Sequence, residues 1–398
     1  MRMVVLTTIL TPYLLPLFTE LNKRADRFDA LLMAERTEDR LWNLSSSNFS
    51  YRILPGLHFR FPGRTVSTHF NFRVIQTLRS LDPDVVISGG FAPANMMAML
   101  YCKIFRKKFI VWGELTLRHE GEASYLKRAI RRLVGGWADG AIASSWEARD
   151  AFRHYGVDDD RILTAVMPVD VDHIHSGAIA FRSTKEFPRL RKRYQSPILL
   201  SIGQIIPRKG YRELFEIYRR LIEAGCEPSL IIIGDGPDRK KLEAEARDRG
   251  WHRVHFQGFI SPDDLPKWFA IGDIFVFHTL FDPFGAVLGE AMAAELPVVS
   301  SVYAAATKDL VKEGVTGFPI DPKDADSSAA AILKVLKMEA AERAAMGRAA
   351  FAQVRRFDAK SSGELIVRFA ESRLRSEKPE GKGLSPEKAA RGTRGGNG

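Results

Sequence analysis

Two acidic residues, Asp282 and Glu290, flank a short turn in the second half of the chain and are the first candidates for chemistry. Pro283 and Gly285 interrupt the chain between them, which predicts that a helix begins near Gly285. The first N–H groups of a helix lack partners within the helix and carry partial positive charge, so such a turn can bind an anion. Glu290 lies about one helical turn further in and can bind a neutral polyol. The pair therefore suits a ligand that is part phosphate and part sugar.

Two adjacent cations, Arg208 and Lys209, lie in the segment GQIIPRKG, which follows an apolar run and precedes a helical pattern. Arginine offers a planar fork of donors and lysine a point charge, a combination that suits a diphosphate. The alternative interpretation is a solvated loop. Because ligands of doubly wound sheets bind beyond the carboxyl ends of the strands, we expect this segment to lie beside the 282–290 turn.

A glycine-rich segment, Gly234-Asp235-Gly236, follows another apolar run. It is not the dinucleotide-binding fingerprint, because Arg239 stands where that motif has its third glycine. On its own the segment indicates a tight turn, and its glycines would let a ligand approach the backbone closely.

The acid pairs Asp82–Asp84 and Asp170–Asp172 have the look of metal ligands. The first pair precedes its strand, which is the wrong end of a sheet for a site, and both pairs are better explained as turns and helix caps. The nine histidines show no HExxH or comparable spacing. We therefore expect no metal site.

Glu114 follows Gly113 at the end of an apolar run in the first half of the chain. At a strand end it could orient or deprotonate an acceptor hydroxyl. Arg118, His119 and Glu120 are alternatives for the same task, or parts of an ordinary polar loop.

The order of apolar and helical patterns predicts an α/β fold. Short apolar runs such as Val85–Ile87 and Ile198–Ile202 alternate with helical patterns along both halves of the chain. This alternation is typical of parallel sheets covered by helices on both faces. The sequence therefore predicts two consecutive doubly wound units.

The domain boundaries follow from a break in this alternation. We expect a first domain over residues 1–172, a linker over 173–196, a second domain over 197–355 and a further helix over 356–376. The Gly-, Pro- and Lys-rich tail, residues 377–398, is expected to be disordered.

Composition narrows the class of protein. With 398 residues and 45% hydrophobic residues, the chain can form real cores. Cys102 and Cys226 lie far apart and fit a reducing compartment, so a cytoplasmic protein is expected. The formal charge of +11 favours anionic partners: a nucleotide, a phospholipid surface or nucleic acid. Charge alone does not choose among them, and the motifs direct the prediction away from nucleic acid.

The segment 125–137 predicts an amphipathic helix. Leu126, Ile130, Leu133, Val134 and Trp137 are expected on one face and the cations Lys127, Arg128, Arg131 and Arg132 on the other. Such a helix is either an ordinary surface helix or one that docks on anionic lipid. The second alternative would place Leu126–Trp137 against the inner face of the cytoplasmic membrane.

Five segments of the second half resemble, in order and spacing, the nucleotide-sugar-binding half of retaining glycosyltransferases of the GT-B fold, family 4. They are GQIIPRKG, IIIGDGP, VHFQGFISPDDLPKWFAIGDIFVF, DPFGAVLGEAMAAELPVVSS and DLVKEGVTGFPIDPKD, spread over residues 198–325. The first half is similar more loosely, through TTILTPYLLPLF, PDVVISGG, WADGAIASS, HYGV and PVDVD. The resemblance implies two Rossmann-like domains facing across a cleft, with the last helix returning to the first domain.

The resemblance also implies a set of residue roles. Glu290 is implied to hold the ribose hydroxyls, Asp282 to contact the transferred sugar, and Arg208 and Lys209 to neutralise the diphosphate. No metal and no cofactor is implied besides the nucleotide-sugar donor, because cations and a helix dipole take the place of a metal. The remaining donor-binding residues implied are Gly203, Gln204, Gly234, Gly258, Phe259, Phe284, Gly285, Ala286 and Val287.

Three positions depart from the family pattern. Asp282 stands where the family has glutamate, Gln204 stands where a phosphate-binding arginine is common, and the acceptor-side histidine has no clear counterpart near Glu114. The sugar contact of Asp282 is the feature that these departures affect most.

The implied reaction moves a hexose from a UDP- or GDP-sugar to a hydroxyl, with retention at the anomeric carbon. A saccharide or lipid-linked acceptor in polysaccharide, lipopolysaccharide or glycolipid synthesis is expected. The alternatives are another GT-B enzyme, such as an epimerase or a phosphorylase, and a non-catalytic nucleotide-sugar binder.

Overall fold

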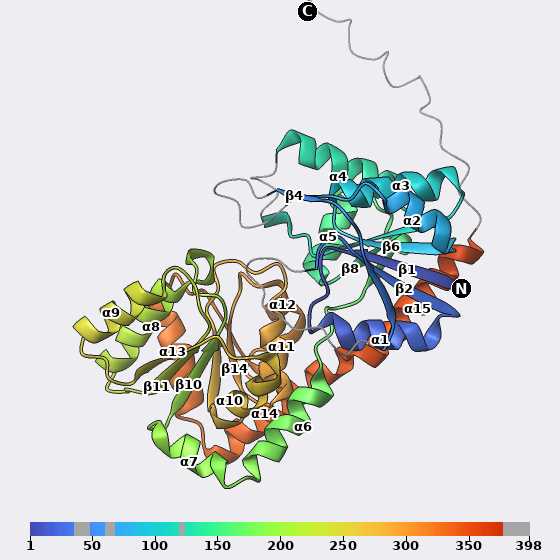
Figure 1. Cartoon of the computed structure of the whole chain (residues 1–398). Coiled ribbons are helices and arrows are strands. Elements are labelled where there is room, and N and C mark those ends of the chain that lie inside the picture. The colour runs from blue at the N-terminus through green and yellow to red at the C-terminus, as the bar shows by residue number, and fades with distance from the viewer. Residues whose placement is uncertain (36–47, 60–67, 119–123, 377–398) are drawn as a thin grey trace, which may run out of the picture.

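Two parallel β-sheets form the centres of two domains (Figure 1). The structure is a computed structural model that describes residues 1–35, 48–59, 68–118 and 124–376. The first sheet has the order β3-β2-β1-β6-β7-β8-β9 and the second has the order β12-β11-β10-β13-β14-β15. This arrangement confirms the predicted α/β class with two doubly wound domains.

The strands are short, and most of their residues are apolar and buried, as expected where helices cover both faces of a parallel sheet. The first sheet contains β1 (Arg2–Thr7), β2 (Arg27–Leu32), β3 (Ser50–Ile53), β6 (Val85–Gly89), β7 (Lys108–Gly113), β8 (Gly140–Ala143) and β9 (Ile162–Thr164). The second contains β10 (Ile198–Ile202), β11 (Ser229–Ile233), β12 (Val254–Gly258), β13 (Ile274–Phe277), β14 (Val298–Ser301) and β15 (Gly317–Ile320). A separate antiparallel pair consists of β4 (Leu57–Phe59) and β5 (Thr68–Phe70).

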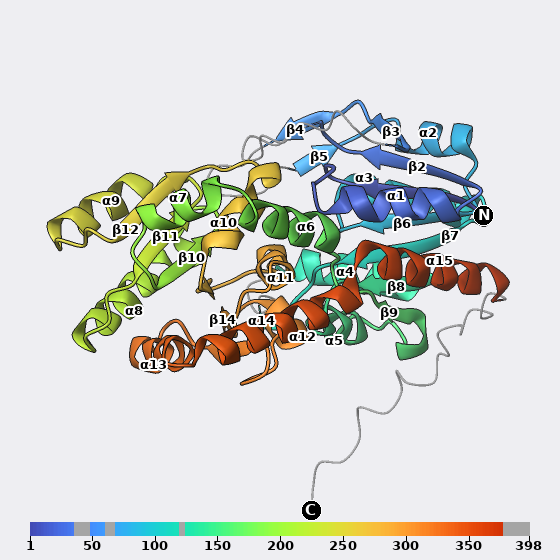
Figure 2. The same ribbon diagram turned by 90° about the horizontal axis from the view of Figure 1, so that it is seen from below.

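Helices connect the strands and cover the sheets (Figures 1 and 2). The first domain has α1 (Leu14–Arg24), α2 (Val74–Leu81), α3 (Pro93–Ile104), α4 (Tyr125–Trp137) and α5 (Trp146–His154). The second has α8 (Tyr211–Glu223), α9 (Arg239–Asp248), α10 (Leu265–Ile271), α11 (Ala286–Ala293), α12 (Ala305–Leu310), α13 (Ala325–Leu336) and α14 (Ala340–Val354).

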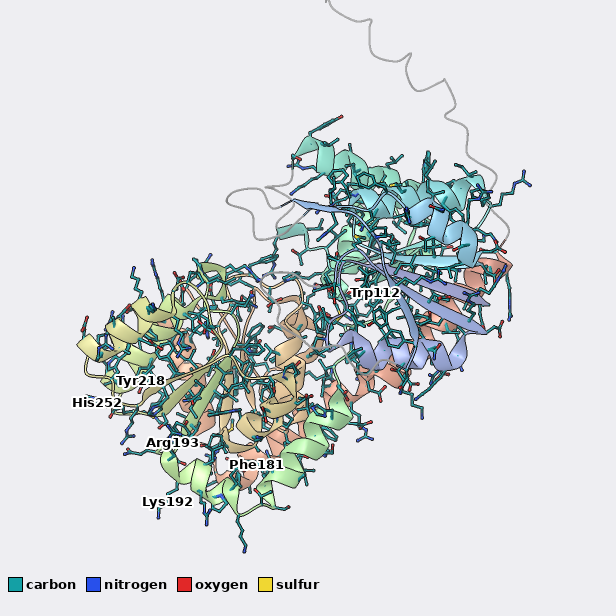
Figure 3. The ribbon with its side chains drawn as sticks, in the orientation of Figure 1. Trp112, Phe181, Lys192, Arg193, Tyr218 and His252 are labelled. Carbon is teal, nitrogen blue, oxygen red and sulfur yellow. The ribbon has the colours of Figure 1, made fainter. Side chains whose placement is uncertain are left out.

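The segment 173–196, predicted as a linker, consists of helices that belong to the second domain. It contains most of α6 (Val171–Arg182) and all of α7 (Glu186–Arg193), and α6 packs against α10 and α11. Figure 3 shows Lys192 and Arg193 on α7 pointing away from the domain, whereas Arg191 of the same helix pairs with Asp273 at 2.7 Å. The polar composition that suggested a break reflects the exposed side of these two helices.

The chain crosses between the domains twice, and the two crossings run side by side. Val169 and Asp358 form a parallel bridge where they meet. After the second crossing, α15 (Ala359–Arg375) packs against α1 of the first domain (Figure 2). The two domains are therefore joined by a paired connection rather than by a single strand of chain.

The carboxyl ends of the two sheets face each other. Arg118, which follows β7, donates a hydrogen bond of 2.5 Å to the carbonyl of Val302, which follows β14. At the start of α5, the amide of Trp146 donates to Asp309 of α12 at 3.3 Å. Any ligand bound at the strand ends of one domain therefore lies on the side that faces the other.

Helix α4 only partly matches the expected division into an apolar and a basic face. Val134 is buried, but Leu126 is 68% exposed and Leu133 and Trp137 are also exposed. Arg131 instead turns inward, over the rings of Phe91 and Tyr155. The helix thus presents much of its apolar surface to solvent.

Several sequence predictions fall outside the described residues: the disordered tail over 377–398, and His119 and Glu120 as alternatives to Glu114. Among the helices that the structure describes, none is both long and apolar enough to cross a membrane.

Candidate functional site

The two cations are carried by a short 3₁₀ turn, η3 (Pro207–Lys209), that follows β10. The carbonyl of Arg208 accepts hydrogen bonds from the amides of Leu280 and Phe281, at 2.9 and 3.1 Å. Its guanidinium Nη1 donates in return to the carbonyl of Phe281 at 3.1 Å. These contacts fasten the cation turn to the segment that follows β13, as the sequence predicted from the two strand ends.

Lys209 forms an ion pair with Asp282, the first of the two flanking acids. The two side chains are only 13% and 14% exposed, so the pair is well shielded from solvent. The second carboxylate oxygen of Asp282, Oδ1, accepts a hydrogen bond from the amide of Phe284 at 3.2 Å. Both oxygens of Asp282 are therefore engaged by the protein itself.

Helix α11 begins directly after this turn, with Gly285 as its N-cap in the left-handed region, φ 98°. The amides of Ala286 and Val287, in the first turn of α11, have no partner within the helix. They follow Asp282 closely in sequence and carry the positive end of the helix dipole. The cation turn and the start of α11 together form a site suited to a diphosphate.

Glu290 lies in the next turn of α11 and is half-buried. Burial raises the pKa of its carboxyl group to about 7, and the negative charge of Asp170 adds to the effect. Asp170 caps α6 by accepting from the amide of His173, as expected of a helix-capping acid. Glu290 thus lies near the first crossing between the domains, a placement that the sequence alone did not predict.

His278 is a residue whose importance sequence reasoning missed. It directly follows β13, and its side chain is buried under the cation turn. The sequence signal that could have drawn attention to it is its position directly after the apolar run Ile274–Phe277.

The remaining donor-side residues lie at neighbouring strand ends of the same sheet. Gly203 and Gln204 follow β10, Gly234 follows β11, and Gly258 ends β12. Gly234 has φ 140°, and a Cβ atom there would lie 1.9 Å from the carbonyl oxygen of Gly203. Close contact between two loops therefore already explains this glycine, without a ligand.

Phe259 follows Gly258 and is 53% exposed. A large aromatic ring left open at the strand ends is a surface on which a planar base can stack. The family resemblance implies that Phe259 belongs to the donor-binding residues.

Glu114 is exposed at the end of β7, on the edge of the first sheet that faces the second domain. Its neighbour Arg118 forms an ion pair with Glu147 at 3.1 Å and contacts Val302 of the second domain. Arg118 therefore serves the contact between the domains, and Glu114 is the acidic candidate that the structure describes at this strand end.

Two further features lie away from the site. Asp82 and Asp84, the first acid pair, form ion pairs with Arg2. A depression of about 540 Å³ lies where β2 and β3 begin and is lined by Asn22, Asp26 and Ser50. Within the described parts of the chain, no three His, Cys, Asp or Glu side chains gather as metal ligands do.

Both domains match models of known glycosyltransferase families. Residues 20–173 match the profile of Glycosyltransferase Family 4, and residues 182–353 match that of Glycosyl transferases group 1. A solved structure of Anabaena HepE in complex with UDP-glucose aligns with a TM-score of 0.73 and 22% identity, over 94% of this chain and all of that one. The fold is therefore GT-B, and the chain belongs to the GT-B glycosyltransferases.

The curated relatives are similar over shorter stretches. The alpha-D-kanosaminyltransferase of Streptomyces kanamyceticus is 31% identical over 37% of this chain and 39% of its own length. The O-antigen chain mannosyltransferase B of Escherichia coli is 28% identical over 54% of this chain and 55% of its own length. The matched stretches thus cover less than two thirds of these relatives.

Proposed function

We propose that this protein transfers a hexose from a UDP- or GDP-sugar to a hydroxyl group, with retention at the anomeric carbon. The observation that carries the proposal is the cation turn of Arg208 and Lys209, fastened beside the start of α11. The similar proteins support a sugar nucleotide as donor, because HepE was solved with UDP-glucose and the curated relatives are named as sugar transferases.

The proposed mechanism follows from where charge develops. As the glycosidic bond to the diphosphate breaks, negative charge gathers on the leaving oxygens, where Arg208, Lys209 and the first amides of α11 stabilise it. The acceptor hydroxyl attacks the oxocarbenium-like carbon from the same face, and its proton goes to a departing diphosphate oxygen. Glu290 accepts from the ribose hydroxyls, and Phe259 stacks on the base.

The proposal is tested by removing the lysine of the cation turn. Lys209→Ala should lower kcat/KM for sugar transfer by about 10²–10³-fold, the usual cost of one group that stabilises transition-state charge. Lys267→Ala is a matched control, because Lys267 also pairs with an aspartate, Asp264 at 2.7 Å, on the exposed surface of α10. Normal transfer by a folded Lys209→Ala protein would refute the assigned role.

We also propose that this reaction uses no metal and no other cofactor, since Arg208 and Lys209 supply the positive charge. Turnover measured in excess EDTA should then equal turnover in added Mg²⁺ or Mn²⁺. Loss of activity in EDTA that a divalent metal restores would contradict the proposal.

A second candidate function is a nucleotide-sugar binder without turnover. The engagement of both Asp282 oxygens by Lys209 and Phe284 favours it, because that carboxylate then has less freedom to contact a sugar. Incubation of the protein with UDP- and GDP-sugars and a lipid extract separates the two functions. Donor binding without hydrolysis or transfer would favour the binder.

We further propose that α4 docks on the anionic inner face of the cytoplasmic membrane, where a lipid-linked acceptor would be reached. Tyr125 is 85% exposed, and Leu126, Leu133 and Trp137 continue the apolar stripe. Lys127 and Arg132 are also exposed and can meet lipid phosphates. A saccharide acceptor in solution would not require this surface.

Sedimentation with vesicles tests the docking proposal. Binding to vesicles containing phosphatidylglycerol should exceed binding to phosphatidylcholine vesicles and should fall at high salt. Leu126→Ser with Leu133→Ser should remove most of the binding, whereas Leu365→Ser, at an exposed leucine of α15, should not. Equal binding to both kinds of vesicle would reject the docking surface.

A further inference from the structure

The buried imidazole of His278 connects three elements beneath the proposed diphosphate site. His278 directly follows β13 and is 3% exposed. Its Nδ1 lies 2.9 Å from the carbonyl oxygen of Gly210, and its Nε2 lies 2.8 Å from Oγ of Ser201 in β10. The ring of Tyr211 packs edge-on against it, with the centroids 4.7 Å apart.

The protonation state of this ring is fixed by its surroundings. Burial lowers the pKa of His278 to about 4, so the imidazole is neutral at physiological pH. A carbonyl oxygen can only accept, so Nδ1 carries the proton and donates to Gly210. Nε2 is then the acceptor, and the hydroxyl of Ser201 donates to it.

Gly210 is the residue that immediately follows Lys209 and ends the cation turn. The carbonyl of Arg208 is already held by the amides that follow β13, so the turn has one anchor before Lys209. The bond from His278 to the carbonyl of Gly210 supplies a side-chain anchor after it, beside the bond of 3.0 Å that the same carbonyl accepts from the amide of Leu214 in α8. The ammonium group of Lys209 lies 5.6 Å from the ring of Phe277, the residue before His278, so backbone and side chain are placed by the same strand end.

We propose that His278 is a positioning residue for the diphosphate: its Nδ1–H bond to Gly210 holds Lys209 where it meets the leaving phosphate. The proposal rests on the proposed function, because it assigns His278 to the donor site described above. The imidazole itself does not reach the ligand and acts only through the backbone of the turn.

Two substitutions separate the two bonds of the imidazole. The side-chain amide nitrogen of asparagine lies near the position of Nδ1, and that of glutamine near Nε2. His278→Asn can therefore keep the donor to Gly210, whereas His278→Gln keeps only the link to Ser201. Ser201→Ala removes that link and leaves the Gly210 bond intact.

The measured quantity is the preference of the protein for a nucleoside diphosphate over the corresponding monophosphate. Dissociation constants of UDP and UMP, and of GDP and GMP, are measured by calorimetry for each variant. We expect His278→Gln to lose about 10-fold of the preference for the diphosphate over the monophosphate, the size of one charge-assisted contact, as Lys209→Ala should. His278→Asn and Ser201→Ala should keep the preference for the diphosphate over the monophosphate.

Several results would overturn the proposal. An unchanged diphosphate preference in His278→Gln would do so, as would equal losses in the asparagine and glutamine variants, which would indicate packing alone. If the wild-type protein binds neither diphosphate, the proposed function fails first, and the inference fails with it. If His278→Gln does not fold, NMR of the wild-type protein decides: a proton on Nε2 instead of Nδ1 contradicts the proposed bond.

Discussion

Asp282 is one of the three positions at which the sequence departs from the family pattern. Its side chain is one methylene shorter than glutamate, and it lies in an ion pair with Lys209 while also accepting from the amide of Phe284. A diphosphate that binds Lys209 must compete with this carboxylate. Asp282 therefore affects donor binding as well as any contact to the sugar.

Asp282→Asn tests this competition. Asparagine can still accept from the Phe284 amide but no longer neutralises Lys209, so UDP or GDP should bind more tightly, by about 5-fold for roughly 1 kcal/mol. Sugar transfer should fall, because the carboxylate proposed to contact the sugar is lost. Calorimetry and turnover assays measure the two effects. Asp282→Ala is the control that also removes the Phe284 contact, and weaker nucleotide binding by Asp282→Asn would contradict the argument.

Glu290 should make donor binding depend on pH. Its pKa is raised from an ordinary 4.5 to about 7, so the carboxyl group of Glu290 is mostly protonated below pH 7. The ribose hydroxyls need the ionised carboxylate as acceptor. Affinity for UDP-glucose, whose phosphates do not titrate near neutrality, should rise from pH 6 to pH 8 by up to about 10-fold. In Glu290→Gln this dependence should vanish.

A second variant checks the cause of the shift. Asp170→Asn removes the negative charge that helps to raise the pKa of Glu290 but can still cap α6, so the midpoint should move to lower pH. The same carboxyl group also affects folding: its contribution to stability is present below pH 4.5 and is lost as pH rises towards 7. An affinity of the wild-type protein for UDP-glucose that stays constant between pH 6 and pH 8 would contradict the predicted pH dependence of donor binding.

At the scale of elements, the site consists of turns that each join a strand end to a helix. The η3 turn leads into α8, and the 278–285 segment leads into α11. The order of apolar runs, prolines and glycines in the sequence was enough to predict these turns and that they lie beside each other. Their mutual fastening through backbone atoms of Arg208, Leu280 and Phe281 was not predictable, because any side chain can donate or accept through its backbone.

Gly285→Ala tests the geometry at the start of α11. The backbone φ of 98° is strained for any residue with a side chain, and a Cβ atom would lie 2.6 Å from the ring of Phe277. The substitution should cost about 2 kcal/mol of stability. It should also weaken nucleoside diphosphate binding more than nucleoside binding, because the first amides of α11 move. Thermal unfolding and calorimetry provide the two measurements, and equal weakening of both ligands would argue against an anion site there.

Helices α7 and α4 show why sequence patterns alone did not predict how each helix packs in the fold. The break in the alternation of strands and helices suggested a linker over 173–196, yet α7 within it is an amphipathic helix whose apolar residues Phe187 and Leu190 pack against the core. In α4, apolar residues at helical spacing predicted an amphipathic helix, and the structure leaves most of its apolar face exposed while Val134 is buried. Periodicity identifies a helix with two faces, but the position of the helix in the fold decides which face the protein covers.

At the scale of the whole molecule, function depends on how the two sheets face each other. The paired crossings at Val169 and Asp358 join the domains on one side, and Arg118, Trp146 and Asp309 make contacts between them on another. Closing of the two domains around a donor would exclude water from the reacting sugar. The sequence predicted two domains and their fold, but contacts between residues 118 and 302 or 146 and 309 leave no local pattern.

Asp309 should make the contact between the domains sensitive to pH. Burial raises the pKa of its carboxyl group from 3.8 to about 7, and Glu147 of the first domain adds to the rise, while the Trp146 amide and Lys308 oppose it. Its Oδ2 atom is buried without a hydrogen-bond partner in the described part of the protein. Separation of the domains would expose the carboxylate to water, so the closed arrangement is favoured at low pH and weakens as pH rises towards 7.

Small-angle X-ray scattering measures this effect as a radius of gyration that is larger at pH 8 than at pH 5. Asp309→Asn, which stays neutral, should keep the smaller radius at both values. Asp150→Asn is the control, because the Lys308–Asp150 pair also joins the domains but is exposed and 3.9 Å long, and it should leave the pH response intact. Glu290→Gln should leave it intact as well, which separates the domain contact from the donor site. Expansion of the Asp309→Asn protein at pH 8 to the same extent as the wild type would show that another group controls the distance between the domains.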